Sequence, residues 1–349
     1  MKFARSCIAA ALALAIGAGW AGAAQAQQKI EMKLAYFVVD PHAMSQWLIR
    51  WADQLEKGSG GRISVKRFPA AQMGPTPQHY DFARTGQADA VWFLHGGTPG
   101  RFPLTEIVSL PFMVGSAEIG TKVLNDTVLR SKYLDAEHRG VKPLILFTHQ
   151  PGGVHTTKKP IRSLDDLKGL RIRFSNPTIR ELVAALGATP VGVPPPEQVE
   201  QLQKGTIDGV FIDYGGAGIA FKMGGTVKYS TELYSYVSSF GLAMNEDFWN
   251  KLPSDLKKLV LDTTTGKEAE IGRAWDALDV PGKKALMDAG GEAIKLSAAD
   301  SAKIRAVGAE VAESTIKGYE AKGLPARAVY DMMRSLSGKH ARTSKNFWN

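Results

Sequence analysis

Residues 170–177 read Leu170-Arg171-Ile172-Arg173-Phe174-Ser175-Asn176-Pro177 and join a strand to a helix. Side chains alternate along a strand, so residues 170, 172 and 174 share an apolar face and the two arginines lie on the other. Asn176 followed by Pro177 is typical of a helix N-cap and first helical residue. We therefore expect a strand over 170–174 that leads directly into a helix, which is the repeating unit of an α/β fold.

Strand–helix alternation continues on both sides of this unit. In the same half of the chain, it predicts strands over 141–148 and 207–212, a helix that Gly187 ends, and a helix over 197–204. In the first half, it predicts strands over 33–39, 62–68 and 88–94, with helices after Pro41 and over 78–84. A chain of 349 residues has room for about two domains. The alternation favours a parallel sheet in each.

The later segments predict connections between the two lobes. Residues 234–244 have the composition of one long strand, long enough to run between lobes. Ser254 is expected to cap a helical region that continues to about Ala277, and residues 297–338 to form C-terminal helices. No Gly/Ser linker separates the halves, so structured crossings are expected, which favours hinged motion.

The first 26 residues have the features of a cleavable secretory signal. Lys2 and Arg5 precede an apolar run over 8–18, and Ala24-Gln25-Ala26 fits the cleavage site. We expect an exported mature chain that begins at Gln27. Cys7 is the only cysteine and leaves with the signal, so disulfides and cysteine-based zinc sites are excluded from the mature chain.

The remaining sequence argues against the common enzyme classes. It has no G-x-S-x-G, P-loop or H-E-x-x-H motif, and no complete G-x-G-x-x-G follows a strand. The seven histidines lack the spacing typical of metal ligands. The net charge of +9 is spread rather than clustered, which indicates a solvated surface, and no nucleic acid or membrane surface is expected as a partner.

Arg173 is the strongest single candidate for binding a ligand. It lies at the carboxyl end of its strand, where open α/β sheets bind ligands, and directly before a helix N-terminus. A guanidinium there could bind a carboxylate through two parallel hydrogen bonds. The residues alone leave a second interpretation open, in which Arg171 and Arg173 both face water.

Other strand ends lead toward the same kind of crevice. They carry aromatic and polar side chains of the kind that small organic ligands use, namely Tyr36, Phe37, Trp92, Phe93, His95, Asp213 and Tyr214. His155, in an expected loop over 152–157, could hydrogen-bond a ligand or line the surface. For each single aromatic residue, packing in the core is the alternative.

Five segments, in the same order along the chain, resemble the DctP-type solute receptors of TRAP (tripartite ATP-independent periplasmic) transporters. They are Ser59-Gly60-Gly61-Arg62-Ile63 with Phe68-Pro69-Ala70-Ala71-Gln72-Met73-Gly74, Leu110-Pro111-Phe112, Asp166-Leu167-Lys168-Gly169-Leu170-Arg171-Ile172-Arg173, Gln201-Leu202-Gln203-Lys204-Gly205-Thr206-Ile207-Asp208-Gly209, and Phe248-Trp249-Asn250-Lys251-Leu252-Pro253. The matches cover nearly all of residues 30–290.

The resemblance implies a two-lobed periplasmic-binding-protein fold of the α/β class. In that fold each lobe is a mixed sheet flanked by helices, each lobe is built from discontinuous stretches, and a long helix spans both lobes. We expect the signal peptide over 1–26, lobe I over 27–150 plus 239–278, and lobe II over 151–238 plus 279–349.

The resemblance also implies a ligand class. The family's carboxylate-binding arginine corresponds to Arg173. Ile212 stands where family members often have Asn or Trp, and it offers no hydrogen bond, which disfavours hydroxyl-rich sugar acids and a metal-assisted 2-oxoacid site. We expect an aromatic or medium-sized oxo- or hydroxy-monocarboxylate, bound by Arg173, Tyr36, Phe37, Trp92, Phe93, His95, His155, Asn176, Asp213, Tyr214 and Phe240.

The implied function is that of a monomeric, non-enzymatic periplasmic receptor. It would close over a small organic acid and deliver it to a TRAP-type permease driven by an ion gradient, with no cofactor and no metal. Two alternatives stay open from the sequence: a periplasmic enzyme that acts on carboxylates, and a receptor of an ATP-driven importer.

Overall fold

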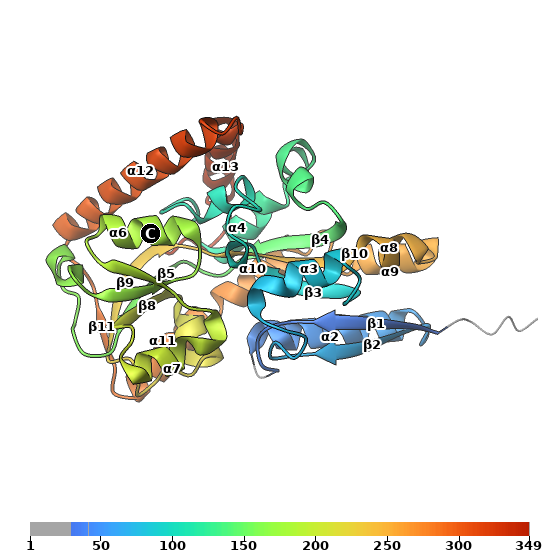
Figure 1. The fold of residues 1–349 in the computed structure, drawn as a ribbon, viewed down its shortest axis with the longest axis horizontal. Helices are drawn as coiled ribbons and strands as arrows, with labels where there is room; N and C mark the ends of the chain where they lie inside the picture. Colours follow the sequence, from blue (N-terminus) through green and yellow to red (C-terminus); the bar gives the residue numbers. More distant parts are fainter. Residues whose placement is uncertain (1–28, 41, 349) are drawn as a thin grey trace, which may run out of the picture.

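The computed structural model describes residues 29–40 and 42–348, which form two mixed β-sheets flanked by helices (Figure 1). The predicted signal peptide over 1–26 and Pro41 lie outside the described residues. In the described part of the chain, no helix is both long and apolar enough to span a membrane. The two-sheet α/β fold expected from the sequence is confirmed.

The first sheet has the strand order β2-β1-β3-β10-β4. Its strands are β1 (Ile30–Ala35), β2 (Ile63–Phe68), β3 (Ala90–Leu94), β4 (Val141–Thr148) and β10 (Ser239–Asn245). Helices α2 (Ala43–Gly58), α3 (His79–Arg84), α8 (Glu246–Lys251) and α9 (Ser254–Asp262) belong to this half. The residues that recur at helical spacing in α2, among them Trp47, Leu48 and Trp51, are buried in one cluster with Met32 and Leu34 of β1.

The second sheet has the strand order β11-β9-β5-β8-β6-β7. Its strands are β5 (Gly152–Thr156), β6 (Arg171–Phe174), β7 (Thr189–Gly192), β8 (Gly209–Ile212), β9 (Tyr229–Tyr236) and β11 (Glu292–Ile294), with α6 (Pro177–Ala185) and α7 (Gln198–Lys204) beside them. The expected loop over 152–157 is therefore wrong: it is the strand β5, in the interior of the sheet. Gly152 and Gly153 give this strand the composition of a loop. In the fold they pass close to neighbouring backbone, at Ile212 and Thr231.

Neither sheet is purely parallel, unlike the pattern expected from strand–helix alternation. β10 is antiparallel to β3 and β4, and β5 is antiparallel to β8 and β9. Both strands enter their sheet directly from the other sheet, with no crossover helix to reverse the chain, and parallel pairing needs such a crossover.

Two of the places where the chain crosses between the sheets are adjacent. The single long strand expected over 234–244 is wrong, because β9 ends at Tyr236, β10 begins at Ser239, and the two pair in different sheets. Residues 149–151 make the other crossing, from β4 to β5. Since β10 pairs with β4 and β9 pairs with β5, the two crossings lie side by side.

The single helical region expected over 254–277 is also wrong. α9 ends at Asp262, Gly266 adopts a positive φ of 75°, and α10 (Glu268–Asp276) begins after this turn. α10 packs on α4 (Ala117–Leu124), and the Asp276 carboxylate accepts the backbone N–H groups of Ala117 at 2.8 Å and Glu118 at 3.0 Å. α11 (Asp279–Asp288) follows and packs on residues 215–220 of the second half.

A long C-terminal helix, α12 (Ala298–Glu320), contacts both halves (Figure 1). Its Ile304 joins the core cluster that contains Ile172 of β6, whereas Ala312 and Ile316 join the cluster that contains Leu146 of β4. The expected long helix that spans both lobes is thus confirmed. α13 (Ala326–His340) follows it, and the Trp348 indole then donates to the Tyr234 carbonyl at 2.8 Å.

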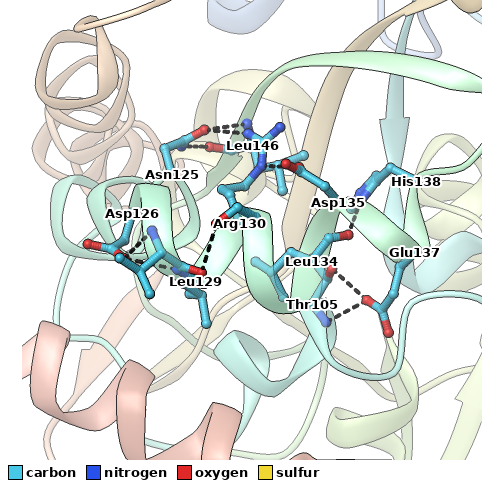
Figure 2. Close-up of polar contacts among 12 residues, drawn as sticks. Thr105, Asn125, Asp126, Leu129, Arg130, Leu134, Asp135, Glu137, His138 and Leu146 are labelled. Carbon is cyan, nitrogen blue, oxygen red and sulfur yellow. Dashed lines mark hydrogen bonds and ion pairs between the residues drawn. The ribbon is translucent and has the colours of Figure 1, made fainter.

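An irregular segment with its own polar network connects β3 to β4 (Figure 2). It contains α4, α5 (Thr127–Leu129) and short turns over 130–137. The Glu137 carboxylate accepts the backbone N–H groups of Leu104 and Thr105 at 2.7 and 2.8 Å. Arg130 donates to the exposed Asp135 at 2.5 Å, so side-chain hydrogen bonds connect the helices and turns of this segment.

Candidate ligand-binding site

A cavity lies between the two sheets, near the carboxyl ends of β3, β6 and β8. Its empty space is about 480 Å³, a volume that includes its opening to solvent. The side of the first sheet contributes Phe37, Val38, Trp92, Leu94 and Phe240, and the side of the second contributes Arg173, Ser175, Ile212, Asp213 and Tyr236.

Arg173 brings a positive charge into this cavity. Its side chain is buried at 3% exposure, and its Nε donates to the Val193 carbonyl at 3.0 Å. Desolvation lowers the pKa of Arg173 to about 10, so the guanidinium stays charged at neutral pH. Among the residues that the structure describes, none forms an ion pair with it. A buried charge without a counter-charge is unfavourable, and an anionic ligand would neutralise it.

Asp213 and His149 form a second polar pair on the cavity wall, with Oδ2 and Nδ1 3.5 Å apart. The backbone N–H of Ser238 donates to His149 Nε2 at 2.9 Å, so the ring proton lies on Nδ1, which donates to the Gln150 carbonyl at 2.5 Å. Burial lowers the pKa of His149 and raises that of Asp213. Asp213 Oδ1 also accepts the Gly216 N–H at 2.7 Å, so protein donors hold its carboxylate.

Three residues between the two sheets, Ser175, Asn176 and Ser238, interact through their hydroxyl and amide groups. Ser238 Oγ donates to Ser175 Oγ at 2.9 Å, and Asn176 Nδ2 lies 3.5 Å from both hydroxyls. Asn176 Oδ1 accepts the Ile179 N–H at 3.0 Å and thereby caps α6, as the sequence predicts. The N-terminus of α6 therefore follows directly after β6, the strand that carries Arg173.

The wall on the side of the first sheet is aromatic. Phe37 and Trp92 stack with ring centroids 4.5 Å apart, and Phe240 and Trp275 stack at 5.9 Å with an interplanar angle of 5°. Trp92 and Phe240 are 5.5 Å apart, so the four rings form one continuous surface. Such a surface matches a flat, apolar ligand body.

His42 completes this wall as a neutral ring. Its centroid lies 5.8 Å from Trp92 and 5.7 Å from Trp275. Nδ1 accepts the Met44 N–H at 3.0 Å and caps α2, which places the ring proton on Nε2. Burial lowers the pKa of His42 to about 4, so the aromatic wall carries no charge at neutral pH.

The structure brings five of the sequence-predicted residues to the cavity: Arg173, Phe37, Trp92, Asp213 and Phe240. Asn176 lies beside it through Ser175 and Ser238. Tyr36 packs in the core instead, with its hydroxyl donating to Asp40 at 2.6 Å. Phe93 packs on the opposite face of the first sheet from Trp92, because consecutive side chains of a strand point to opposite faces.

The remaining three predicted residues lie outside the cavity lining. His95 pairs with His138 through their Nε2 atoms at 2.9 Å, beside the segment of Figure 2. His155 bonds the Ser230 hydroxyl at 2.8 Å within the second sheet. Tyr214 packs against the His155 ring at 5.2 Å, and its hydroxyl donates to Glu232 at 3.3 Å. Their proposed contacts with ligand stay predictions.

Sequence reasoning missed most of the other lining residues, among them His149, Tyr236, Trp275 and Gln198. His149 directly follows β4, the same strand-end signal that selected His95, so it could have been found. Tyr236 ends β9, but the prediction of one strand over 234–244 hid that strand end. Trp275 and Gln198 belong to helices α10 and α7, and tertiary packing places them at the cavity. No local sequence pattern predicts this position.

Within residues 29–40 and 42–348, no group of three or more His, Cys, Asp or Glu side chains is placed to hold a metal ion. The cavity therefore offers one guanidinium, one His–Asp pair, hydroxyls and aromatic rings. This arrangement can bind an anion with an apolar body.

Several solved structures are similar to this chain over most of its length. A TRAP solute-binding protein from Rhodoferax ferrireducens T118, in complex with copurified benzoate, has a TM-score of 0.86 and 29% identity, over 91% of this chain and 100% of that chain. A marine metagenome TRAP solute-binding protein specific for aromatic acid ligands, in complex with metahydroxyphenylacetate, has a TM-score of 0.85 and 31% identity, over 89% and 99%. A TRAP periplasmic solute-binding protein from Bordetella bronchiseptica with bound (R)- and (S)-mandelate has a TM-score of 0.80 and 28% identity, over 89% and 99%.

The DctP family model, described as bacterial extracellular solute-binding protein, family 7, matches residues 34–318. This match and the TRAP relatives decide against the enzyme and against the receptor of an ATP-driven importer. The chain belongs to the DctP family of bacterial extracellular solute-binding proteins, the solute receptors of TRAP transporters.

Proposed function

We propose that the chain is the periplasmic receptor for an aromatic or medium-sized oxo- or hydroxy-monocarboxylate. Arg173 binds the carboxylate, and the rings of Phe37, Trp92, Phe240 and Trp275 enclose the body. The observation that carries the proposal is the buried guanidinium, which has no anionic partner among the described residues and faces an uncharged aromatic wall.

The lining favours one charged end and one apolar end on the ligand. Asp213 is held by its own donors and would repel a second carboxylate placed beside it. Ile212 and the stacked rings offer apolar contact, which supports an aromatic ring over a polyhydroxylated sugar acid. The benzoate, metahydroxyphenylacetate and mandelate bound by the similar structures support the same class.

The ligand also explains why two lobes would close. We propose lobe I over 27–150 plus 239–278 and lobe II over 151–238 plus 279–349. The paired crossings at residues 149–151 and 237–238 join them, together with a third connection between α10 and α11. The arginine belongs to the second sheet and most of the aromatic wall to the first. A ligand held by both binds the closed form better, which shifts the population toward it.

The cellular setting follows from the same proposal. Signal cleavage after Ala26 delivers a monomer to the periplasm, where the loaded form meets the integral-membrane subunits of a TRAP permease. No nucleic acid is a partner.

Arg173→Ala in the chain from Gln27 to Asn349 tests the proposal by calorimetry with aromatic, oxo-, hydroxy-, di- and sugar-derived acids. Removing the buried partner of a carboxylate should cost about 2–5 kcal/mol, or roughly 30- to 5,000-fold in Kd. Arg171→Ala is the matched control, because Arg171 lies two residues away on the same strand, is exposed, and pairs with Asp208 at 2.8 Å. It should leave the affinity unchanged.

Two results would contradict the proposal. Native carboxylate affinity in the Arg173→Ala protein would remove the assigned role of the guanidinium. Tight binding of a sugar acid, with no response to any aromatic acid, would exclude the proposed ligand class.

A further inference from the structure

Gln198 is a buried amide on the cavity wall with no partner of its own. It is the first residue of α7, is fully buried, and lines the cavity together with Pro195. Neither Nε2 nor Oε1 makes a hydrogen bond with any described residue. Nearly all buried polar side chains are hydrogen-bonded, and an unpaired one destabilises the protein, so a pair of unpaired atoms on one amide indicates a missing partner.

Two indoles of the aromatic wall share this property. Trp92 Nε1 and Trp275 Nε1 are buried and have no acceptor among the described residues. Both residues line the same cavity as Gln198. The lining thus contains three unpaired donor groups, namely two indole N–H groups and one amide NH₂, and one unpaired acceptor, Gln198 Oε1.

The unpaired acceptor, Gln198 Oε1, limits the chemical class of ligand that the site can fully satisfy. A carboxylate only accepts hydrogen bonds, so an acid held by Arg173 could satisfy donors but not Gln198 Oε1. An unsubstituted aromatic acid would leave that oxygen unpaired in a desolvated site. A hydroxyl both donates and accepts, and it can therefore pair with Oε1 while its oxygen accepts from an N–H of the lining.

We propose that Gln198 is a specificity-determining residue that selects acids carrying a hydroxyl group in addition to the carboxylate. This inference rests on the proposed function, in which Arg173 binds the carboxylate and the rings hold the body. It goes further by assigning the second polar group of the ligand and the residue that recognises it.

The test compares acids that differ only by one hydroxyl: mandelate with phenylacetate, 3-hydroxyphenylacetate with phenylacetate, and 3-hydroxybenzoate with benzoate. Calorimetry gives Kd for each acid with the wild-type chain, Gln198→Leu, and Gln203→Leu. Gln203 is the matched control, because it lies on the same helix and is exposed. Gln198→Met, which keeps an unbranched side chain, serves as a second variant if the leucine protein does not fold.

For at least one pair, the wild type should bind the hydroxylated acid about ten-fold or more tightly than its parent, since a missing hydrogen bond leaves a buried acceptor unpaired. Gln198→Leu should abolish that preference by weakening only the hydroxylated acid, with the parent acid bound as before or better. Gln203→Leu should behave as the wild type. Retained affinity for the parent acid shows that the site is intact and that the effect is not one of folding.

The outcomes separate this inference from the proposed function. If the wild type shows no hydroxyl preference, or if the preference survives in Gln198→Leu and Gln198→Met, the role of Gln198 is refuted while carboxylate binding stands. If no acid binds the wild type, the proposed function fails and this inference fails with it.

Discussion

Arg171 and Arg173 show how two identical residues on one strand face take different roles. Both leave β6 on the same side, as alternation predicts. Arg171 is exposed near the start of the strand and pairs with Asp208 through two hydrogen bonds at 3.0 and 2.8 Å. Arg173 is buried two residues later, where the second sheet meets the first. The sequence predicts the shared face, but the depth of burial depends on residues of the other sheet.

A buried titratable group lies outside the cavity, at the carboxyl of Glu106. Its carboxyl is buried, Oε1 has no partner among the described residues, and burial with the nearby Glu137 carboxylate raises the pKa of Glu106 to about 8. From pH 4.5, its ordinary pKa, to about 8, the native state binds more protons than the unfolded state. The free energy of unfolding contributed by this group therefore falls as pH rises through that window.

Glu106→Gln should remove this pH dependence. The unfolding free energy of the variant relative to wild type should rise between pH 4.5 and 8, by on the order of a few kcal/mol in total. Denaturant unfolding at several pH values measures it, with the exposed Glu310→Gln as control. A constant difference across the window would contradict the assignment.

At the scale of elements, α10 depends on a close approach to α4. A Cβ on Gly272 would lie 2.3 Å from the Glu118 Cα, and one turn later Asp276 accepts two N–H groups at the start of α4. The same helix carries Trp275 into the cavity. The contact therefore supports both stability and the position of one ring of the aromatic wall.

Gly272→Ala should lower the free energy of unfolding by about 1–3 kcal/mol or more, since backbone must move to admit the methyl group. Gly318→Ala is the matched control on α12, where nothing lies within 4 Å of the added Cβ. That change should stabilise by about 0.5–1 kcal/mol through helix propensity. Urea midpoints measure both, and equal effects of the two substitutions would show that the α10–α4 contact is not tight.

The elements predicted well are those with local signals at their ends. The helix α6 begins at Pro177 after an Asn176 cap, as expected, and α2 buries the residues that recur at helical spacing. Two of the wrong predictions, over 234–244 and 254–277, concern segments in which the apolar pattern continues although the packing partner changes. The break at residues 237–238 depends on which sheet each strand joins, and that information is not local.

At the scale of the whole molecule, the candidate site combines residues that are far apart in sequence. Phe37, Trp92, Arg173 and Trp275 come from both halves and meet only in the folded chain. Strand-end reasoning predicted the first three, because the carboxyl ends of strands form ligand crevices. It also selected Tyr36 and Phe93, since it could not decide the direction of consecutive side chains near a strand end.

Ligand binding should make the molecule more compact. In the proposed closure, the arginine of one half and the rings of the other come together around one ligand. The radius of gyration from small-angle scattering should therefore fall when an aromatic acid that binds to the protein is added. The Arg173→Ala protein at the same acid concentration should not contract. An unchanged radius in the saturated wild type, with binding verified by calorimetry, would exclude hinged closure as the response.

The aromatic wall has a practical consequence. Of the seven tryptophans in the chain, Trp92 and Trp275 line the cavity, each stacked or tilted against other rings. Indole fluorescence changes with the polarity and stacking of its surroundings, so an aromatic acid seated between these rings should alter the emission of the protein. Trp92→Phe would reduce that change while it preserves the aromatic surface. The receptor thus carries a built-in optical reporter of its occupancy, and a titration requires no dye or label.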